Sequence, residues 1–333
     1  MAKIGIPRTL AYFLYFPFCK EFFDSLGHEV VLSTPTSKAI LDRGVKETVT
    51  DACIPIKLYH GHVADLIGKV DYIFAPRLVS FRKFGDFDTE TLCPKFLGLP
   101  DMLRASIDDL SPIIDTRLHL RPGKKQLYLA GQEIGSILGD NPVQVKRAVT
   151  RARRVQKKFE KLLYEGMTPT EAMDVLYGDQ PGPVNRVDDE AEFRIAVVGY
   201  PYIIYDPYVN VGLLKLLQRE DARVYTQDML SARKMAQAGR ELPKQMFWYF
   251  SNRAVHGAVY FMKQDYIDGV IHVTAFACGP DAMVDRMMEF QAKKYGMPFM
   301  SIMVDEHTGE GGVKTRIEAF LDMLRYRRER DEN

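Results

Sequence analysis

The sequence predicts an α/β fold in which two parallel-sheet domains flank a helical section. Short apolar runs alternate with longer helical segments over residues 1–115, and the same pattern returns over residues 190–333. This alternation is typical of a parallel sheet covered on both faces by helices. The chain of 333 residues also exceeds the about 100–150 residues of an ordinary domain. We therefore expect two α/β domains, with residues 116–180 as the helical section.

The first domain opens with a short buried strand, and its strands and helices alternate from there. We expect strands at residues 2–7, 30–32 and 72–75, and helices at residues 10–26, 38–43 and 54–67. The helical section has few β-branched runs and carries apolar side chains at helical spacing, namely Val145, Val149, Ala152, Phe159 and Leu163. Residues 178–190 are rich in proline, glycine and acids, so we expect a linker there.

The second domain repeats the pattern of the first. We expect strands at residues 194–199, 223–226, 269–274 and 299–304, and helices at residues 207–217, 281–295 and 313–326. Three sequence features occur in the same order in both halves: a strand that contains glycine, a proline before the next helix, and a cysteine followed by a proline-aspartate pair. This repetition indicates two similar α/β units.

Composition excludes several classes of protein. The formal charge is +1, from 45 basic and 44 acidic residues, so the chain lacks the broad field that binding to nucleic acid or a membrane surface requires. No run approaches the ~18 apolar residues of a membrane span. The apolar stretch at residues 10–19 is broken by Pro17 and lacks a cleavage site, so we expect a cytoplasmic protein without a signal peptide. Four cysteines in so long a chain do not suggest a disulfide framework.

Three of the four cysteines lie where a parallel sheet binds ligands. Cys53 opens the expected helix 54–67, Cys93 follows the third strand, and Cys278 follows the strand 269–274, each with a proline one or two residues further on. Ligands bind beyond the carboxyl ends of parallel strands, and thiols at helix starts are more acidic and bind soft metals as thiolates. A single such cysteine would be read as a buried apolar residue. Three together favour a metal site.

The spacing of these cysteines does not identify the metal. They are separated by 40 and 185 residues, so no CxxC motif exists and only the fold can assemble a site. Spacing alone does not separate zinc from iron-sulfur. Cys19 lies within the aromatic expected helix 10–26, and we expect it to pack in the core.

An ordered set of motifs along nearly the whole chain resembles the acyl-CoA dehydratase activase-related family. Relatives of this family are the subunits of 2-hydroxyacyl-CoA dehydratases and benzoyl-CoA reductases, and the double-cubane cluster proteins of anaerobes. The motifs are Gly5-Ile6-Pro7-Arg8, Ala52-Cys53-Ile54-Pro55-Ile56-Lys57 with His60-Gly61-His62, Cys93-Pro94 with Pro100-Asp101, Ala277-Cys278-Gly279-Pro280-Asp281-Ala282-Met283, and Asp305-Glu306-His307-Thr308-Gly309-Glu310.

The resemblance implies an oxygen-sensitive iron-sulfur cluster between Rossmann-like domains, with Cys53, Cys93 and Cys278 as ligands. The position of Cys19 is usually aromatic in the family, so it is not assigned. The chain has too few thiols for a double cubane, so a single 4Fe-4S cluster with a non-cysteine fourth site fits better. The resemblance also implies electrons from an ATP-dependent activator protein and a small substrate such as an acyl-CoA, and it leaves a homodimer open.

Two functions of different classes remain at this stage. One is a reductase or dehydratase-like enzyme, and the other is a non-catalytic electron carrier or cluster-bearing regulatory module. A structural zinc protein is a third reading, which the resemblance opposes. No phosphate-binding loop occurs, and Gly309-Glu310-Gly311-Gly312 lacks the lysine of one, so ATP hydrolysis would belong to a partner.

Some polar residues have both a functional and a structural reading. We expect one of His60 and His62 to pack or cap and the other to face the cluster. The polar residues Asp305, Glu306, His307 and Glu310 are read either as proton-transfer groups or as a solvated loop before a helix. Residues 146–161 hold eight basic residues and one acid, usually a solvated helix face and less often a docking site for CoA phosphates or a partner.

Overall fold

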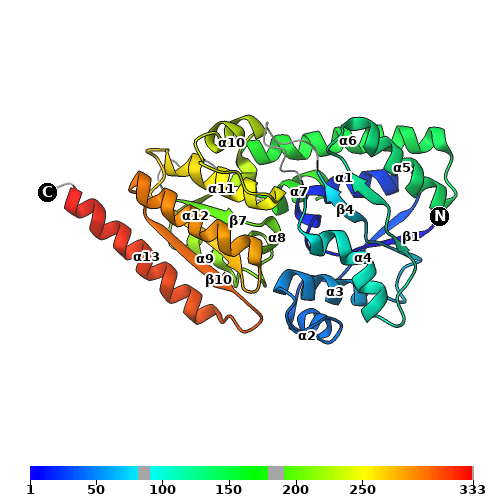
Figure 1. Ribbon diagram of the computed structural model, residues 1–333, viewed down its shortest axis with the longest axis horizontal. Coiled ribbons are helices and arrows are strands. Elements are labelled where there is room, and N and C mark those ends of the chain that lie inside the picture. Colours follow the sequence, from blue (N-terminus) through cyan, green and yellow to red (C-terminus); the bar gives the residue numbers. More distant parts are fainter. Residues whose placement is uncertain (82–90, 179–190, 332–333) are drawn as a thin grey trace.

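The computed structural model describes residues 1–81, 91–178 and 191–331, and it shows two parallel sheets with helices packed around them (Figure 1). The first sheet has the strands β1 (Lys3–Ile6), β2 (Glu29–Leu32), β3 (Tyr72–Phe74) and β5 (Ile113–Ile114), in the order β2-β1-β3-β5. All pairings within it are parallel. The expected parallel sheet of the first half is confirmed.

The helices of the first half connect these strands. They are α1 (Tyr12–Asp24), α2 (Lys38–Lys46), α3 (Ile54–Leu66) and α4 (Pro94–Ser106). A separate parallel pair is formed by β4 (Arg77–Ser80) and β6 (Arg117–His119). Neither α4 nor this pair is expected from the sequence, because Pro100 lies inside α4 and both strands are very short.

The second sheet has the same topology as the first. Its strands are β7 (Phe193–Gly199), β8 (Ala222–Thr226), β9 (Gly269–Ala275) and β10 (Phe299–Val304), in the order β10-β9-β7-β8. In each sheet the first strand lies between the second and the third, and the fourth pairs with the third. This shared order supports the reading of the two halves as similar units.

The helices of the second half are α8 (Pro201–Ile204), α9 (Leu213–Arg219), α10 (Ala232–Gly239), α11 (Tyr249–Met262), α12 (Gly279–Tyr295) and α13 (Glu310–Asp331). A 3-10 turn, η1 (Gln227–Met229), follows β8. The expected helix 207–217 is wrong in its first half, because the helix begins only at Leu213. Val211 and Gly212 have positive φ angles of 54° and 74°, and a right-handed helix does not run through two such residues.

The helical section consists of α5 (Lys124–Leu138), α6 (Pro142–Tyr164) and α7 (Pro169–Tyr177). Its apolar face is the expected one, since Val145, Val149, Ala152, Phe159 and Leu163 are all buried, and α6 lies against α1 (Figure 1). These side chains share a core with β1 and α1, while a second, larger core spans both sheets and the helices between them.

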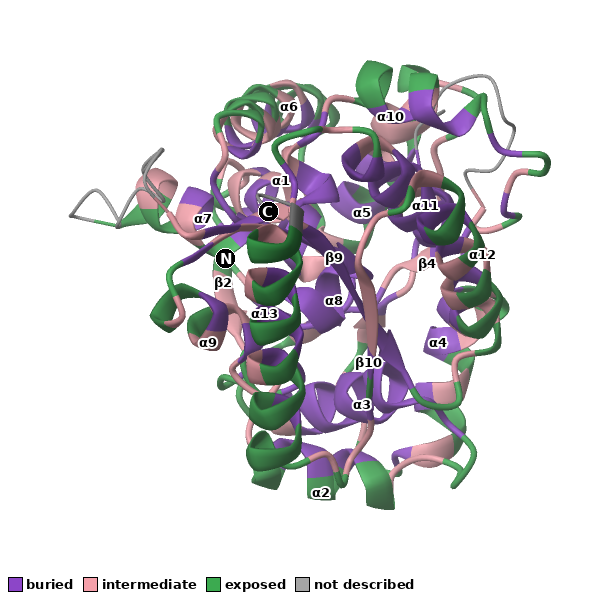
Figure 2. Ribbon diagram, turned by 90° about the vertical axis from the view of Figure 1, so that its left-hand side faces the viewer, coloured by how far each residue is buried: buried purple, intermediate pink, exposed green. Residues whose placement is uncertain are grey.

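Burial follows this arrangement, with buried residues concentrated along β9, α3 and α11 and exposed ones along the outer side of α13 (Figure 2). The expected linker at residues 178–190 lies outside the described residues except for Gly178. The division into domains at residues 115 and 190 stays a prediction. None of the described helices is long and apolar enough to cross a membrane.

Candidate functional site

Cys53, Cys93 and Cys278 line one cavity of about 220 Å³, which we call the three-cysteine cavity. Each is the residue that immediately precedes a helix: Cys53 precedes α3, Cys93 precedes α4 and Cys278 precedes α12. Three segments separated by 40 and 185 residues in the chain therefore meet at one place. The helix starts of both halves form the site, which is what the strand-end argument predicts.

Proline and backbone geometry explain why each helix begins at its cysteine. Pro55, Pro94 and Pro280 lie in the first two positions of their helices, where proline needs no hydrogen-bond partner and its fixed φ angle starts a helix. Cys53 and Cys93 are extended, with ψ angles of 151° and 155°. The residue before a proline favours this conformation, and Cys93 is such a residue.

The turn that carries Cys278 is strained. Ala277, the preceding residue, has a φ angle of 60°, in the left-handed region that residues with a side chain seldom adopt. Strain of this kind persists only where the surroundings enforce it, and it clusters at functional sites. Ala277 itself lines the three-cysteine cavity.

Burial favours the protonated form of the thiols in this cavity. Burial raises the pKa of the Cys93 thiol, and the backbone amides of Phe96 and Lys95 only partly oppose this. Burial, followed by the carboxylate of Asp281, raises the pKa of Cys278 well above its usual value. The thiols of Cys93 and Cys278 are therefore neutral at pH 7. The N-termini of α3, α4 and α12 carry a partial positive charge at the same place.

Six of the eighteen described residues that line the cavity are aromatic. Tyr200, Tyr202, Trp248, Tyr249 and Phe250 line it from the second half of the chain. Among the described residues that line it, Lys95 is the only one with a charged side chain. Such walls exclude water and lower the local dielectric, which strengthens electrostatic interactions inside.

A buried polar triad supports α12 behind Cys278. The imidazole of His272, on β9, lies between two carboxylates, with its Nδ1 2.8 Å from Asp285 Oδ1 and its Nε2 3.3 Å from Asp281 Oδ1. His272 and Asp281 are fully buried. Burial opposes the charged form of His272, but the two carboxylates outweigh it and raise the pKa to about 9. The sequence offered one signal for this residue, a histidine inside an otherwise apolar strand.

The histidines on α3 do not line the three-cysteine cavity, so the expectation that one faces a cluster there is not met. The Nδ1 of His60 lies 2.9 Å from the carbonyl oxygen of Ile56, one turn back. His62 lies between the hydroxyl groups of Ser33 and Thr36, at 2.9 and 3.0 Å. Burial lowers the pKa of both, that of His62 to about 4, so both are neutral at pH 7.

The acidic segment after β10 has a structural role. Asp305 accepts hydrogen bonds from the Thr308 hydroxyl and the His307 amide, which closes the loop before α13. Glu306 forms a 2.6 Å ion pair with Lys57, whose side chain is buried on α3 near Cys53. The reading as a loop before a helix is confirmed, and the ion pair joins the two halves of the chain.

Cys19 and the basic residues 146–161 do not line the three-cysteine cavity. Cys19 lines a second cavity of about 280 Å³ beside α5 and α6, and it is not part of the three-cysteine cavity. Burial raises the pKa of its thiol to about 12. The basic residues 146–161 are on α6, where Lys146, Arg147, Arg151, Arg154, Lys157, Lys158 and Lys161 are exposed.

No group of three or more His, Cys, Asp or Glu side chains in the described parts of the chain could hold a single metal ion. A zinc site needs about four ligands that converge on one point. A four-iron cluster binds each thiolate to a different iron, so its thiolates stand further apart around a larger group. Cysteine thiols are chemically suitable ligands for iron, and the three cysteines line one cavity.

Comparison with known proteins gives two matching family models. Residues 3–230 match the CoA enzyme activase uncharacterised domain, and residues 144–324 match the 2-hydroxyglutaryl-CoA dehydratase D-component. Each match covers more than half of the chain, and the second includes Cys278 and its helix. No curated protein matches. The chain belongs to the family of the CoA enzyme activase uncharacterised domain, and its residues 144–324 belong to the family of the 2-hydroxyglutaryl-CoA dehydratase D-component.

Proposed function

We propose that this protein is an iron-sulfur protein of the 2-hydroxyacyl-CoA dehydratase type, with Cys53, Cys93 and Cys278 as ligands of one 4Fe-4S cluster. The observation that carries the proposal is that these three cysteines, each at a helix N-terminus, line one apolar cavity. The protein would accept low-potential electrons from an ATP-dependent activator and pass them to a small substrate such as an acyl-CoA. The matches to activase and dehydratase families support this role.

The residues of the cavity fit such a cluster. Burial keeps the Cys93 and Cys278 thiols protonated without metal, and cluster binding would displace these protons. When bound, the cluster would supply one-electron transfer at a potential set by its ligands, hydrogen bonds and exposure. The aromatic walls would keep water away from it, and the first-turn amides of α3, α4 and α12 would stabilise its negative charge.

The fourth iron would have no cysteine ligand from this cavity. Among the described residues that line it, three are cysteines and none is histidine, aspartate or glutamate. An iron without a protein ligand is open to water or substrate, which favours an enzyme over a carrier. The phenol groups of Tyr200 and Tyr202 line the cavity and are candidates for orienting a substrate there. Tyr200 is itself held by a 2.8 Å hydrogen bond to Ser251.

A non-catalytic electron carrier is the second candidate, and one observation favours it. The charged lining residue identified in the three-cysteine cavity is Lys95, so the described walls offer little acid-base chemistry for a substrate. A carrier needs only a cluster close to a docked partner. The two candidates differ in one result: a substrate changes the spectrum of the cluster in the enzyme and leaves it unchanged in the carrier.

The same proposal implies a partner protein and a cellular environment. Cytoplasmic thiols stay reduced, which suits three free cysteines, and an oxygen-sensitive cluster suits an anaerobic cell. The sequence lacks a phosphate-binding loop, so ATP hydrolysis is assigned to the activator. The exposed basic side chains of α6 are a candidate surface for steering an acidic partner.

The test is the iron content and EPR spectrum of the full chain after anaerobic reconstitution. We expect about four irons per chain, and we expect Cys53→Ser, Cys93→Ser and Cys278→Ser to lose most of the iron. Cys19→Ser is the matched control, because Cys19 lies at the other cavity, and it should keep its iron. Equal iron content in all four variants would overturn the ligand assignment.

A further inference from the structure

The second cavity, of about 280 Å³, is lined by residues of α1, α5 and α6, together with residues of α11 and the β4-β6 pair. We call it the α6 cavity. Its volume is close to the lower end of the about 300–1,000 Å³ of small-molecule sites. Tyr249 lines both this cavity and the three-cysteine cavity. The two spaces are thus neighbours across one aromatic side chain, and the cysteine ligands proposed above do not line the α6 cavity.

The body of the α6 cavity is apolar. Aromatic and aliphatic side chains from α1, α5, the first sheet and the β4-β6 pair line it, among them Phe18, Phe22, Phe74, Leu118, Leu127 and Ile134. A space of this kind favours a hydrocarbon chain or ring, because moving apolar surface out of water is favourable.

One face of α6 adds a polar stripe to this apolar space. Arg153, Gln156, Lys157 and Glu160 all line the cavity, and their spacing of three, four and seven residues places them on one side of the helix. Lys124 lines it from α5. Three basic side chains against one acid give this part of the cavity a net positive charge. The guanidinium of Arg153 is fixed by a 3.1 Å hydrogen bond to the Tyr128 hydroxyl.

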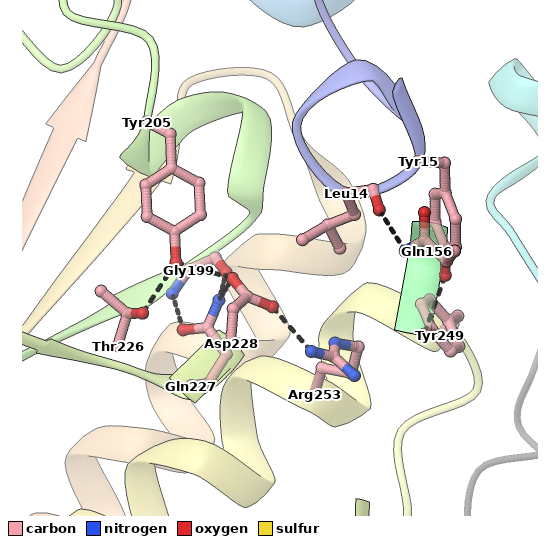
Figure 3. Close-up of polar contacts among 10 residues, drawn as sticks. All are labelled: Leu14, Tyr15, Gln156, Gly199, Tyr205, Thr226, Gln227, Asp228, Tyr249 and Arg253. Carbon is pink, nitrogen blue, oxygen red and sulfur yellow. Dashed lines mark hydrogen bonds and ion pairs between the residues drawn. The ribbon is translucent and has the colours of Figure 1, made fainter. Parts of the chain in front are cut away.

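Gln156 leaves one polar atom of the stripe without a hydrogen-bond partner in the described structure. Its Nε2 donates a 2.9 Å hydrogen bond to the carbonyl oxygen of Leu14, beside Tyr15 and Tyr249 (Figure 3). Its Oε1 is buried and has no hydrogen-bond partner among the described residues. A buried acceptor without a donor is unfavourable, so a ligand that brings an N-H or O-H group would satisfy it.

We propose that the α6 cavity binds an amphipathic anion: an apolar chain lies among the aromatic side chains, its carboxylate or phosphate contacts Lys157 and Arg153, and a neighbouring N-H or O-H group donates to Gln156. This site is separate from the proposed cluster, and its test needs no iron.

The experiment is calorimetric titration of the full chain with N-octanoylglycine, which has an apolar chain, an amide N-H and a carboxylate. Octyl phosphate replaces the carboxylate, decanoate lacks the N-H, and decyltrimethylammonium reverses the charge. We expect one saturable site for the anions, tighter for N-octanoylglycine than for decanoate, and at least about fivefold weaker binding of the cation. No saturable binding of any anion, or equal binding of the cation, would overturn the proposal.

Two matched variants on α6 locate the site. Lys157→Glu should weaken N-octanoylglycine binding by about fivefold or more, whereas Lys158→Glu, an equally exposed neighbour that does not line the cavity, should leave it unchanged. Gln156→Leu should remove the advantage of N-octanoylglycine over decanoate. Equal effects of the two lysine variants would show that general surface charge, and not this cavity, binds the anion. Both lysines are exposed, so both variants should fold.

Discussion

The three-cysteine cavity and the α6 cavity are built differently. The first is formed by residues at helix starts, including three helix N-termini, two in the first half of the chain and one in the second. The second is lined largely by the sides of helices, with its polar residues along one face of α6. Helix starts offer amide groups to an anionic cluster, while helix sides offer area to an apolar ligand. The difference teaches that one chain can place two cavities of different construction next to each other, with Tyr249 lining both.

The largest difference between the two regions is expected when His272, which lies between Asp281 and Asp285 behind the three-cysteine cavity, is replaced. His272→Gln leaves the fully buried Asp281 without the imidazolium that faces it. Removing one partner of a buried ion pair costs about 3–5 kcal/mol, so we expect a loss of that order in the free energy of unfolding in urea. His307→Gln, in an exposed loop, is the control and should change it by less than about 0.5 kcal/mol. Similar losses in the free energy of unfolding for His272→Gln and His307→Gln would contradict a stabilising role for the buried triad.

The same triad predicts how stability depends on pH. The folded pKa of His272 is raised from its usual 6.5 to about 9, so the folded state binds the proton more tightly than the unfolded state. The stabilisation is therefore complete below pH 6.5 and is lost as the pH rises through 9. Urea unfolding between about pH 6 and pH 9 should show the native chain losing stability, and His272→Gln should show a flatter profile. Parallel profiles would argue against a charged His272.

A smaller difference in stability is expected between glycine-to-alanine variants of the two regions. A Cβ atom on Gly44 would lie 1.8 Å from the backbone oxygen of Lys57, where α2 crosses the helix that follows Cys53. A Cβ atom on Gly135, beside the α6 cavity, would meet only the side chain of Val145, at 2.3 Å. Backbone yields less than a side chain, so Gly44→Ala should destabilise by about 3 kcal/mol or more and Gly135→Ala by about 1–2. Thermal unfolding of both variants would rank them, and the reverse order would contradict this account.

The fold could be predicted from the sequence where local signals are strong. Buried strands such as β7 and β9 are mostly apolar, and proline near Cys53, Cys93 and Cys278 indicates helix starts. Helix α9 begins later than expected because a left-handed backbone at Val211 carries no residue signature.

The site could be predicted only in part, for a physical reason. The three cysteines are recognisable from their turns, but the aromatic walls from Trp248 to Phe250 and the ion pair of Lys57 with Glu306 depend on contacts between distant segments. The role of His62 likewise depends on Ser33 and Thr36, which lie outside its helix. Tertiary contacts of this kind leave no periodic pattern in a single sequence.

The most direct test of the central claim is the position of iron in a crystal grown without oxygen. Anomalous difference maps collected above and below the iron edge should show one strong site in the three-cysteine cavity, within bonding distance of Cys53, Cys93 and Cys278, and none beside Cys19. An iron site elsewhere, or iron bound by fewer than these three cysteines, would contradict the account.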